Sequence, residues 1–232
     1  MPRYRISRID FIPAGRRCSF CSRELKSRVA YVLLDERGGE CLSGPTCLSN
    51  HAKVDKSKET YPNFTKACKG EMSDHKEAKT PAKREASGKV KAQEGNQEIE
   101  YLLLRFRMLG SFPGMRIKSL EEVYERYMRD GRLNDDDQLH VSRLIAKVSK
   151  ERPEYSPKNL NACYAYSHWI KVALEGLPVE KQGFLRQILF SLMKNLYLSP
   201  SQAGAVNKWF AKIEGAPALD PEAFVPACKA VG

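Results

Sequence analysis

The chain has 232 residues, and 39 lysine and arginine residues against 28 aspartate and glutamate residues give it a formal net charge of +11. A charge of this sign favours a polyanionic partner and carries no information about the fold. No apolar run reaches the roughly 18 residues that cross a bilayer, and the N-terminal residues lack the apolar core of a secretory signal. We therefore expect no membrane association. Seven cysteines, an odd number, indicate metal ligands in the reducing cytoplasm and argue against a disulfide framework.

Residues 1–51 are predicted to form a small α+β module. A Cys-x-x-Cys knuckle comes first, and residues 28–35 then alternate in the manner of a strand. A turn with two glycines leads into a second short strand at residues 40–43. Thr46 is in the right place to cap a helix that begins at Cys47. The expected order is knuckle, β-hairpin, helix.

The cysteines of this module have the spacing of zinc ligands. Zn²⁺ prefers four thiolate or imidazole ligands in a tetrahedron, and Cys18 and Cys21 supply two of them from one tight turn. Cys47 and His51 lie four residues apart, which places them on one side of a helix, where they supply the other two. Cys41 is the alternative fourth ligand and would give an all-thiolate site. Four protein ligands leave no open position for water, so the predicted zinc is structural.

The stretch from Cys18 to His51 resembles a small module of the treble-clef or zinc-ribbon kind, found in uncharacterised phage- and plasmid-borne proteins. Those proteins share the C-x-x-C knuckle, a hairpin with a glycine turn, and Gly-x-x-Cys leading a helix. The segment LYLSPSQAGAVNKWFAKI also resembles a helical segment of such proteins. The resemblance implies a DNA-associated protein of a mobile element, without an assigned activity. Cys41 stands where these proteins have a strand residue that is not a ligand, which favours His51.

Basic residues surround the predicted knuckle. The first 28 residues contain eight lysines and arginines against two acidic residues, a net charge of +6. Guanidinium groups form paired hydrogen bonds with phosphate oxygens, and neutralising phosphates releases counterions. We expect these side chains to contact nucleic acid, DNA in preference to RNA: Arg3, Arg5, Arg8, Arg16, Arg17, Arg23, Lys26 and Arg28.

Residues 52–95 differ abruptly in composition. They are rich in lysine, glutamate, alanine and serine, and have almost no large apolar residues after Phe64. Such a segment buries too little surface to offset the entropy lost on ordering. We predict a flexible charged linker.

The remainder of the chain contains an internal repeat. Shifting the sequence by 65 residues aligns residues 96–148 with residues 161–213 without a gap, with ten identical pairs in 53 positions. The apolar residues of both copies recur at three- and four-residue spacing, which is typical of packed helices. The pattern predicts an all-α domain of two tandem three-helix repeats at residues 96–215, which binds a protein partner. A loosely packed tail, residues 216–232, follows.

Sequence signals for catalysis are weak. Of the four histidines, only His51 is in a position that demands one, and neither a phosphate-binding glycine loop nor a nucleophile elbow is present. Three consecutive aspartates from Asp135 are explained by the dipole at a helix start. The sequence thus predicts a non-enzymatic, zinc-dependent nucleic-acid-binding protein of a phage or plasmid. The alternatives are a protein-interaction adaptor or subunit of a larger nucleoprotein complex and, among enzymes, a metal-dependent nuclease.

Overall fold

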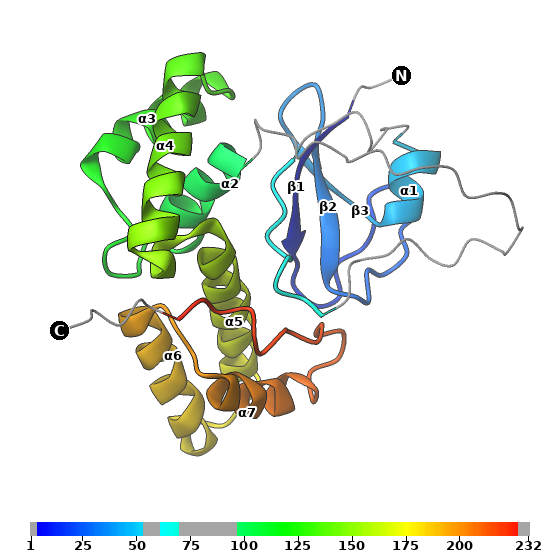
Figure 1. Ribbon diagram of the computed structural model, residues 1–232. Coiled ribbons are helices and arrows are strands. Elements are labelled where there is room, and N and C mark those ends of the chain that lie inside the picture. Colours follow the sequence, from blue (N-terminus) through cyan, green and yellow to red (C-terminus); the bar gives the residue numbers. More distant parts are fainter. Residues whose placement is uncertain (1–3, 53–60, 70–96, 227–232) are drawn as a thin grey trace, which may run out of the picture.

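The computed structural model describes residues 4–52, 61–69 and 97–226 (Figure 1). A three-stranded antiparallel sheet has the order β1-β2-β3, formed by Arg5–Phe11, Val29–Leu34 and Glu40–Ser43. Helix α1, Pro45–Asn50, follows β3 directly. Figure 1 shows the sheet between α1 and the other helices. The N-terminal part is therefore a small α+β unit, as its sequence predicts.

The helical part contains six α-helices and three shorter helical segments within the described residues. The first helix, α2, continues without a break into the π-helix η1, and short 3₁₀ helices, η2 and η3, precede α5 and α6. The bounds are α2 Gln97–Leu103, η1 Leu104–Met108, α3 Lys118–Asp130, α4 Asp135–Glu151, η2 Pro153–Tyr155, α5 Pro157–Glu175, η3 Val179–Lys181, α6 Gly183–Asn195 and α7 Pro200–Phe210.

Helix starts in the two halves fall at equivalent positions. Helices α3 and α6 each have 13 residues and begin at residues 118 and 183, a difference of 65, and α4 and α7 begin at 135 and 200, again a difference of 65. The Asn134 side chain caps α4 by accepting a hydrogen bond from the Asp137 amide, and Ser199 forms a capping box with Gln202 at the start of α7. The offset equals that of the sequence alignment, but common ancestry of the two halves stays a prediction.

Two features of the N-terminal part differ from the sequence expectation. Helix α1 begins at Pro45, with Gly44 as its N-cap, so the predicted cap at Thr46 is wrong. Proline at the first position supplies the helical φ angle without needing a hydrogen bond. Strand β1 was not expected, because a bulge after Ile6 breaks the alternation of apolar residues.

Residues 61–69 lie inside the predicted linker but are packed into the fold. Phe64 is fully buried, and its amide donates to the Ile9 carbonyl oxygen at 3.1 Å, along the outer edge of β1. The buried carboxylate of Glu100 accepts hydrogen bonds from Lys66 Nζ at 2.7 Å and from the Asn63 amide at 3.1 Å. The linker prediction is therefore wrong for this stretch; residues 53–60 and 70–96 lie outside the described residues.

Part of the predicted loose tail is also packed. The amide of Lys69 donates to the Ala218 carbonyl at 2.6 Å, and the amide of Asp220 donates to the Ala67 carbonyl at 2.8 Å. Leu219 and Phe224 are buried. Residues 218–220 thus pair with residues 67–69, and the expectation of loose packing is wrong for this part of the tail.

The sheet is joined to α5 by an aromatic cluster. The Phe11 ring lies 5.1 Å from the His168 ring and 5.6 Å from the Trp169 ring, measured between centroids. The Arg28 guanidinium lies over the Trp169 ring at 4.7 Å, and the Tyr164 hydroxyl donates to Asp10 at 2.7 Å. Buried side chains of the sheet and of the helices consequently form one continuous hydrophobic core.

His168 makes this junction sensitive to pH. Burial lowers the pKa of the imidazole to about 4 from its ordinary 6.5; the Arg28 and Lys171 charges lower it further, and the Asp10 carboxylate opposes them. The folded state holds His168 neutral while the unfolded chain binds a proton, so its contribution is complete above about pH 6.5 and is lost as the pH falls towards 4. We expect the free energy of unfolding to be about 2 kcal/mol lower at pH 5 than at pH 8 on this account. Urea titrations of wild type and His168→Phe should show that difference only in the wild type; equal pH profiles would contradict it.

Candidate metal centre

The first two candidate ligands lie in a tight hairpin, residues 16–25, which we call the knuckle. The Cys18 amide donates to the Arg23 carbonyl at 2.9 Å, and the Ser22 amide donates back to the Cys18 carbonyl at 3.0 Å. Ser22 has a φ of 57°, a left-handed conformation that glycine adopts at lower cost. These bonds close the turn that carries Cys18 and Cys21.

The knuckle is docked on the outer edge of β3. The Ser19 amide donates to the Leu42 carbonyl at 2.8 Å, and the Leu42 amide donates to Ser19 Oγ at 3.0 Å. One residue thus satisfies both backbone groups of an otherwise unpaired edge position. Ser19 was not among the predicted site residues, because nothing in the local pattern distinguishes it from a spacer between the two cysteines.

Helix α1 supplies the third candidate ligand. The chain passes from β3 through Gly44 and Pro45 into the helix, and the fully buried Leu48 fixes α1 against the core. Cys47 lies in the first turn of this helix. The sulfur atoms of Cys18, Cys21 and Cys47 lie within 4.8 Å of one another. The predicted grouping of these three cysteines is therefore confirmed.

Polar groups around the cluster favour a thiolate at Cys18. Burial alone would raise the pKa of this thiol, but hydrogen bonds from the backbone amides of Phe20, Gly44 and Cys21 and from the Cys47 thiol lower it to about 7. Burial raises the pKa of Cys47 to about 12, and its hydrogen bonds to Cys21 and Cys18 act in the same direction. Cys18 therefore loses its proton before Cys47, and a bound cation would displace the protons that remain in the cluster.

This donor set fits a metal ion. At Zn–S bonds of about 2.3 Å, tetrahedral geometry places sulfur atoms about 3.8 Å apart, a separation that small side-chain movements produce from the observed cluster. Amides aimed at a sulfur atom stabilise a metal-bound thiolate in the same way as a free one. The three sulfurs would occupy three positions of the ion, and one ligand more completes a structural site.

The two candidates for the fourth ligand lie in different surroundings. His51 is exposed directly after α1, and its amide donates to the Cys47 carbonyl at 3.0 Å, so it lies one turn from Cys47. Cys41 pairs with the fully buried Leu33 across the sheet, and it packs against the hydrophobic core. Directly paired residues share a face of the sheet. Neither side chain belongs to the cluster of three sulfurs.

Five of the eight predicted nucleic-acid contacts are exposed: Arg5, Arg16, Arg17, Arg23 and Lys26. Three of them are in the knuckle, so they flank Cys18 and Cys21 directly. Arg3 lies outside the described residues.

Arg8 and Arg28 are buried and already engaged, so the sequence expectation for these two is wrong. Arg8 donates from Nε to Asp10 at 3.0 Å and from Nη1 to Glu40 at 2.8 Å. Arg28 lies over Trp169, as described above. These contacts could not be predicted from local sequence, because Glu40 is 32 residues from Arg8 and Trp169 is even farther along the chain from Arg28.

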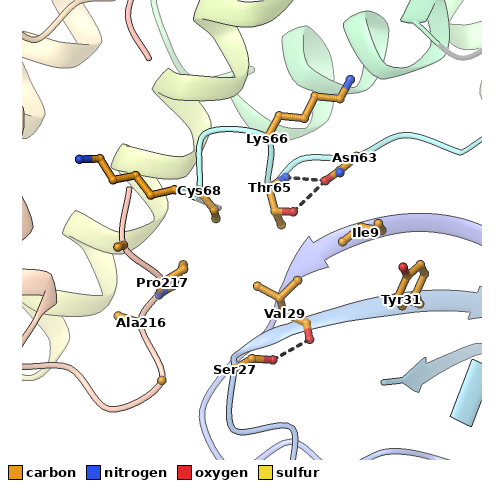
Figure 2. A pocket seen from close by; sticks show the side chains of 13 residues that line it. Ile9, Ser27, Val29, Tyr31, Asn63, Thr65, Lys66, Cys68, Ala216 and Pro217 are labelled. Atoms are coloured by element: carbon orange, nitrogen blue, oxygen red, sulfur yellow. Dashed lines mark hydrogen bonds between the residues drawn. The ribbon is translucent and has the colours of Figure 1, made fainter. Parts of the chain in front are cut away.

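A separate cavity of about 880 Å³ lies between the sheet, the 61–69 segment and residues 215–218 (Figure 2). Two of its hydroxyl groups bond to neighbouring groups of the lining: Thr65 Oγ1 donates to Asn63 at 2.8 Å, and Ser27 Oγ donates to the Val29 carbonyl at 3.3 Å. Lys66 extends away from it towards Glu100. Lys69 also lines the cavity and is exposed, so one cationic side chain is available there. The sulfur cluster brings three ligand atoms together and is the better candidate site.

The chain matches no protein-family model, no curated protein and no solved structure. No helix among the described residues is long and apolar enough to cross a membrane. We therefore infer its function from the geometry of this chain alone.

Proposed function

We propose that the chain is a non-enzymatic nucleic-acid-binding protein, that a structural Zn²⁺ ion orders its basic knuckle, and that its duplicated helical part binds a protein partner. The observation that carries the proposal is the cluster of three sulfurs from the knuckle and α1, with exposed arginines directly before Cys18 and shortly after Cys21 in the sequence. One ion bound there would join two backbone segments and hold Arg16, Arg17 and Arg23 in a fixed array. Arginines in such an array suit the phosphates of a nucleic-acid backbone, to which they donate paired hydrogen bonds.

We assign His51 as the fourth ligand. It lies one turn from Cys47 on the solvent side, whereas Cys41 shares a sheet face with Leu33. Elemental analysis of purified protein should give one zinc per chain for the wild type and for Cys41→Ser, and clearly less for His51→Ala after dialysis. Full zinc in His51→Ala with loss in Cys41→Ser would reverse the assignment.

Nucleic-acid binding is tested by the knuckle arginines. In the triple variant Arg16→Ala, Arg17→Ala and Arg23→Ala, we expect weaker binding to duplex nucleic acid of random sequence. The slope of log affinity against log salt concentration should be smaller by up to about 2.7, because each phosphate that is no longer neutralised removes about 0.9 from the slope. Fluorescence anisotropy at several salt concentrations measures both quantities. DNA and RNA duplexes and single strands are compared in the same assay, with DNA expected to bind more tightly.

The matched control removes three positive charges elsewhere, at the exposed residues Arg132, Arg143 and Lys150. Equal decreases in affinity in both triple variants would show that only net charge matters, and an unchanged slope in the knuckle variant would overturn the proposal in favour of a protein-interaction adaptor. Deleting residues 1–51 is unsuitable as a test, because the sheet packs against α5. Incubation with Mg²⁺, Mn²⁺ or Zn²⁺ should produce no cleavage; cleavage would indicate a nuclease.

A further inference from the structure

The cavity of about 880 Å³ beside the sheet has the size of a small-molecule site, which is about 300–1,000 Å³ in most proteins. One wall is a face of the sheet. Ile9 of β1 is paired with Tyr31 of β2, and Val29 lies two residues before Tyr31, so the three side chains share that face. All three residues are buried. This wall is therefore apolar and belongs to the core of the fold.

The second wall, residues 215–218, is fixed in place by the backbone. The Lys69 amide donates to the Ala218 carbonyl at 2.6 Å. Gly215 has a φ of 72°, and a Cβ atom at this position would lie 2.0 Å from the Lys26 carbonyl oxygen, so the chain passes directly against the turn before β2. A ligand would enter a space whose walls are already in position, which reduces the ordering cost of binding.

The cavity surface is largely apolar. Figure 2 shows Thr65, Cys68, Val29 and Pro217 around the same space. Burial raises the pKa of the Cys68 thiol to about 12, so the thiol is uncharged at neutral pH and adds to the apolar surface. Because the Thr65 hydroxyl is already bonded to Asn63, an apolar group placed beside it leaves no hydrogen bond unmade.

The charged side chains that line the cavity are two lysines, and no acidic residue lines it. Lys66 Nζ donates to both carboxylate oxygens of Glu100, each at 2.7 Å, which neutralises this lysine. Lys69 is exposed and adds one positive charge. Outside the lining, Lys26 and Glu214 are exposed next to its ends, and their charges offset each other. The lining thus carries a single positive charge beyond the ion pair.

From this combination we propose that the cavity binds a small apolar monoanion, an aromatic or aliphatic carboxylate, with its apolar part on the sheet and its carboxylate at Lys69. A cationic ligand would meet a lysine and no acidic side chain. A nucleoside triphosphate would bring several negative charges to one available cation and would place polar groups against apolar walls. A metal ion would find a single thiol, that of Cys68, outside the sulfur cluster.

This inference goes beyond the proposed function and does not depend on it, since the cavity contains none of the knuckle arginines. The cavity exists only where the sheet, the 61–69 segment and residues 215–218 meet in the folded chain. A ligand bound there therefore stabilises the native state, and the thermal midpoint should rise with ligand concentration.

Fluorescence titration of the full chain with anilinonaphthalene sulfonate, an apolar monoanion, tests the proposal. We expect saturable binding of one probe per chain. In competition, naphthoate should displace the probe at a concentration about 2–5-fold lower than naphthylmethanol, which has the same rings without the charge, because an exposed charge contact contributes about that factor. Naphthylmethylammonium, the cationic analogue, should compete less well than either.

Two variants place the probe in the cavity. Cys68→Phe fills the space and should abolish saturable binding. Lys69→Gln alters an exposed side chain and should weaken naphthoate about 2–5-fold while leaving naphthylmethanol unchanged. Lys150→Gln, at an exposed lysine on α4 outside the cavity lining, is the matched control and should bind both compounds as the wild type does.

Four results would overturn the inference. These are a wild type without saturable probe binding, equal competition by the three naphthalenes, naphthoate binding unchanged in Lys69→Gln, and full probe binding in a Cys68→Phe protein that keeps the wild-type thermal midpoint. The triple knuckle variant should bind the probe normally, and loss of binding there would place the probe on the knuckle and also overturn the inference. Nucleic-acid affinity is measured separately, so failure at the cavity leaves the proposed function to its own test.

Discussion

Replacement of Cys47 by serine is expected to remove the zinc from the purified protein and to release the knuckle from α1. Cys47 is the ligand of the sulfur cluster that α1 contributes, so its loss leaves two cysteines on a single turn. Substitution of residues that hydrogen-bond to the ligands of a zinc site already lowers the affinity for the metal about 10–100-fold, and loss of a ligand lowers it more. We therefore expect less than about a tenth of the wild-type zinc after dialysis. Elemental analysis measures it directly.

Chelation should have the same effect on stability as the substitution. A metal present at about 1,000 times its dissociation constant contributes about 4 kcal/mol to the free energy of unfolding, and a strong chelator withdraws that contribution. Calorimetry with and without chelator should show a lower midpoint for the wild type and no shift for Cys47→Ser. Cys68→Ala, a cysteine outside the cluster, is the matched control and should retain both the zinc and the shift. The zinc proposal would be wrong if the reduced protein is purified without metal and has the same unfolding midpoint with and without chelator.

Local signals in the sequence located the helices and the sulfur cluster. The three- and four-residue spacing of apolar residues is read from a few neighbouring residues, and the structure has helices where that spacing occurs. The short Cys18–Cys21 spacing and the place of Cys47 at a predicted helix start are local signals, and the zinc-ligand pattern linked them across 26 residues.

Contacts between residues that are distant in the sequence could not be predicted from such local signals. Phe64 and Ala67 are too few to give residues 61–69 a periodic pattern, yet both are buried once β1 offers an unpaired edge. The pairing of residues 67–69 with residues 218–220 spans about 150 positions and has no local signature. Arg8 and Arg28 looked like solvent-facing cations because their partners are distant in sequence. Errors in the site prediction therefore came from tertiary contacts.

Whether the sheet and the helices unfold together is tested by Trp169→Ala, which carries the second largest expected effect. Trp169 is fully buried, with Phe11 and Arg28 of the sheet region at 5.6 and 4.7 Å and Phe210 of α7 at 6.5 Å. Truncation of a buried tryptophan costs about 3–5 kcal/mol, because the cavity it leaves adds to the lost burial. The missing side chain touches both parts, so we expect one cooperative transition at lower urea concentration.

Trp209→Ala is the matched control for this prediction. Trp209 is only half-buried, with Lys212 Nζ at 5.0 Å from its ring, so its removal should cost about 1 kcal/mol. Urea titrations followed by far-UV circular dichroism and by tyrosine fluorescence show whether the sheet and the helices unfold in one transition or in two. A wild type with two separate transitions, of which Trp169→Ala shifts only one, would show that module and helical domain are independent. Coincident transitions that shift together would mean that the aromatic junction on α5 makes the knuckle part of the same cooperative unit. In that case the helices limit how far the basic surface can reorient on a nucleic acid.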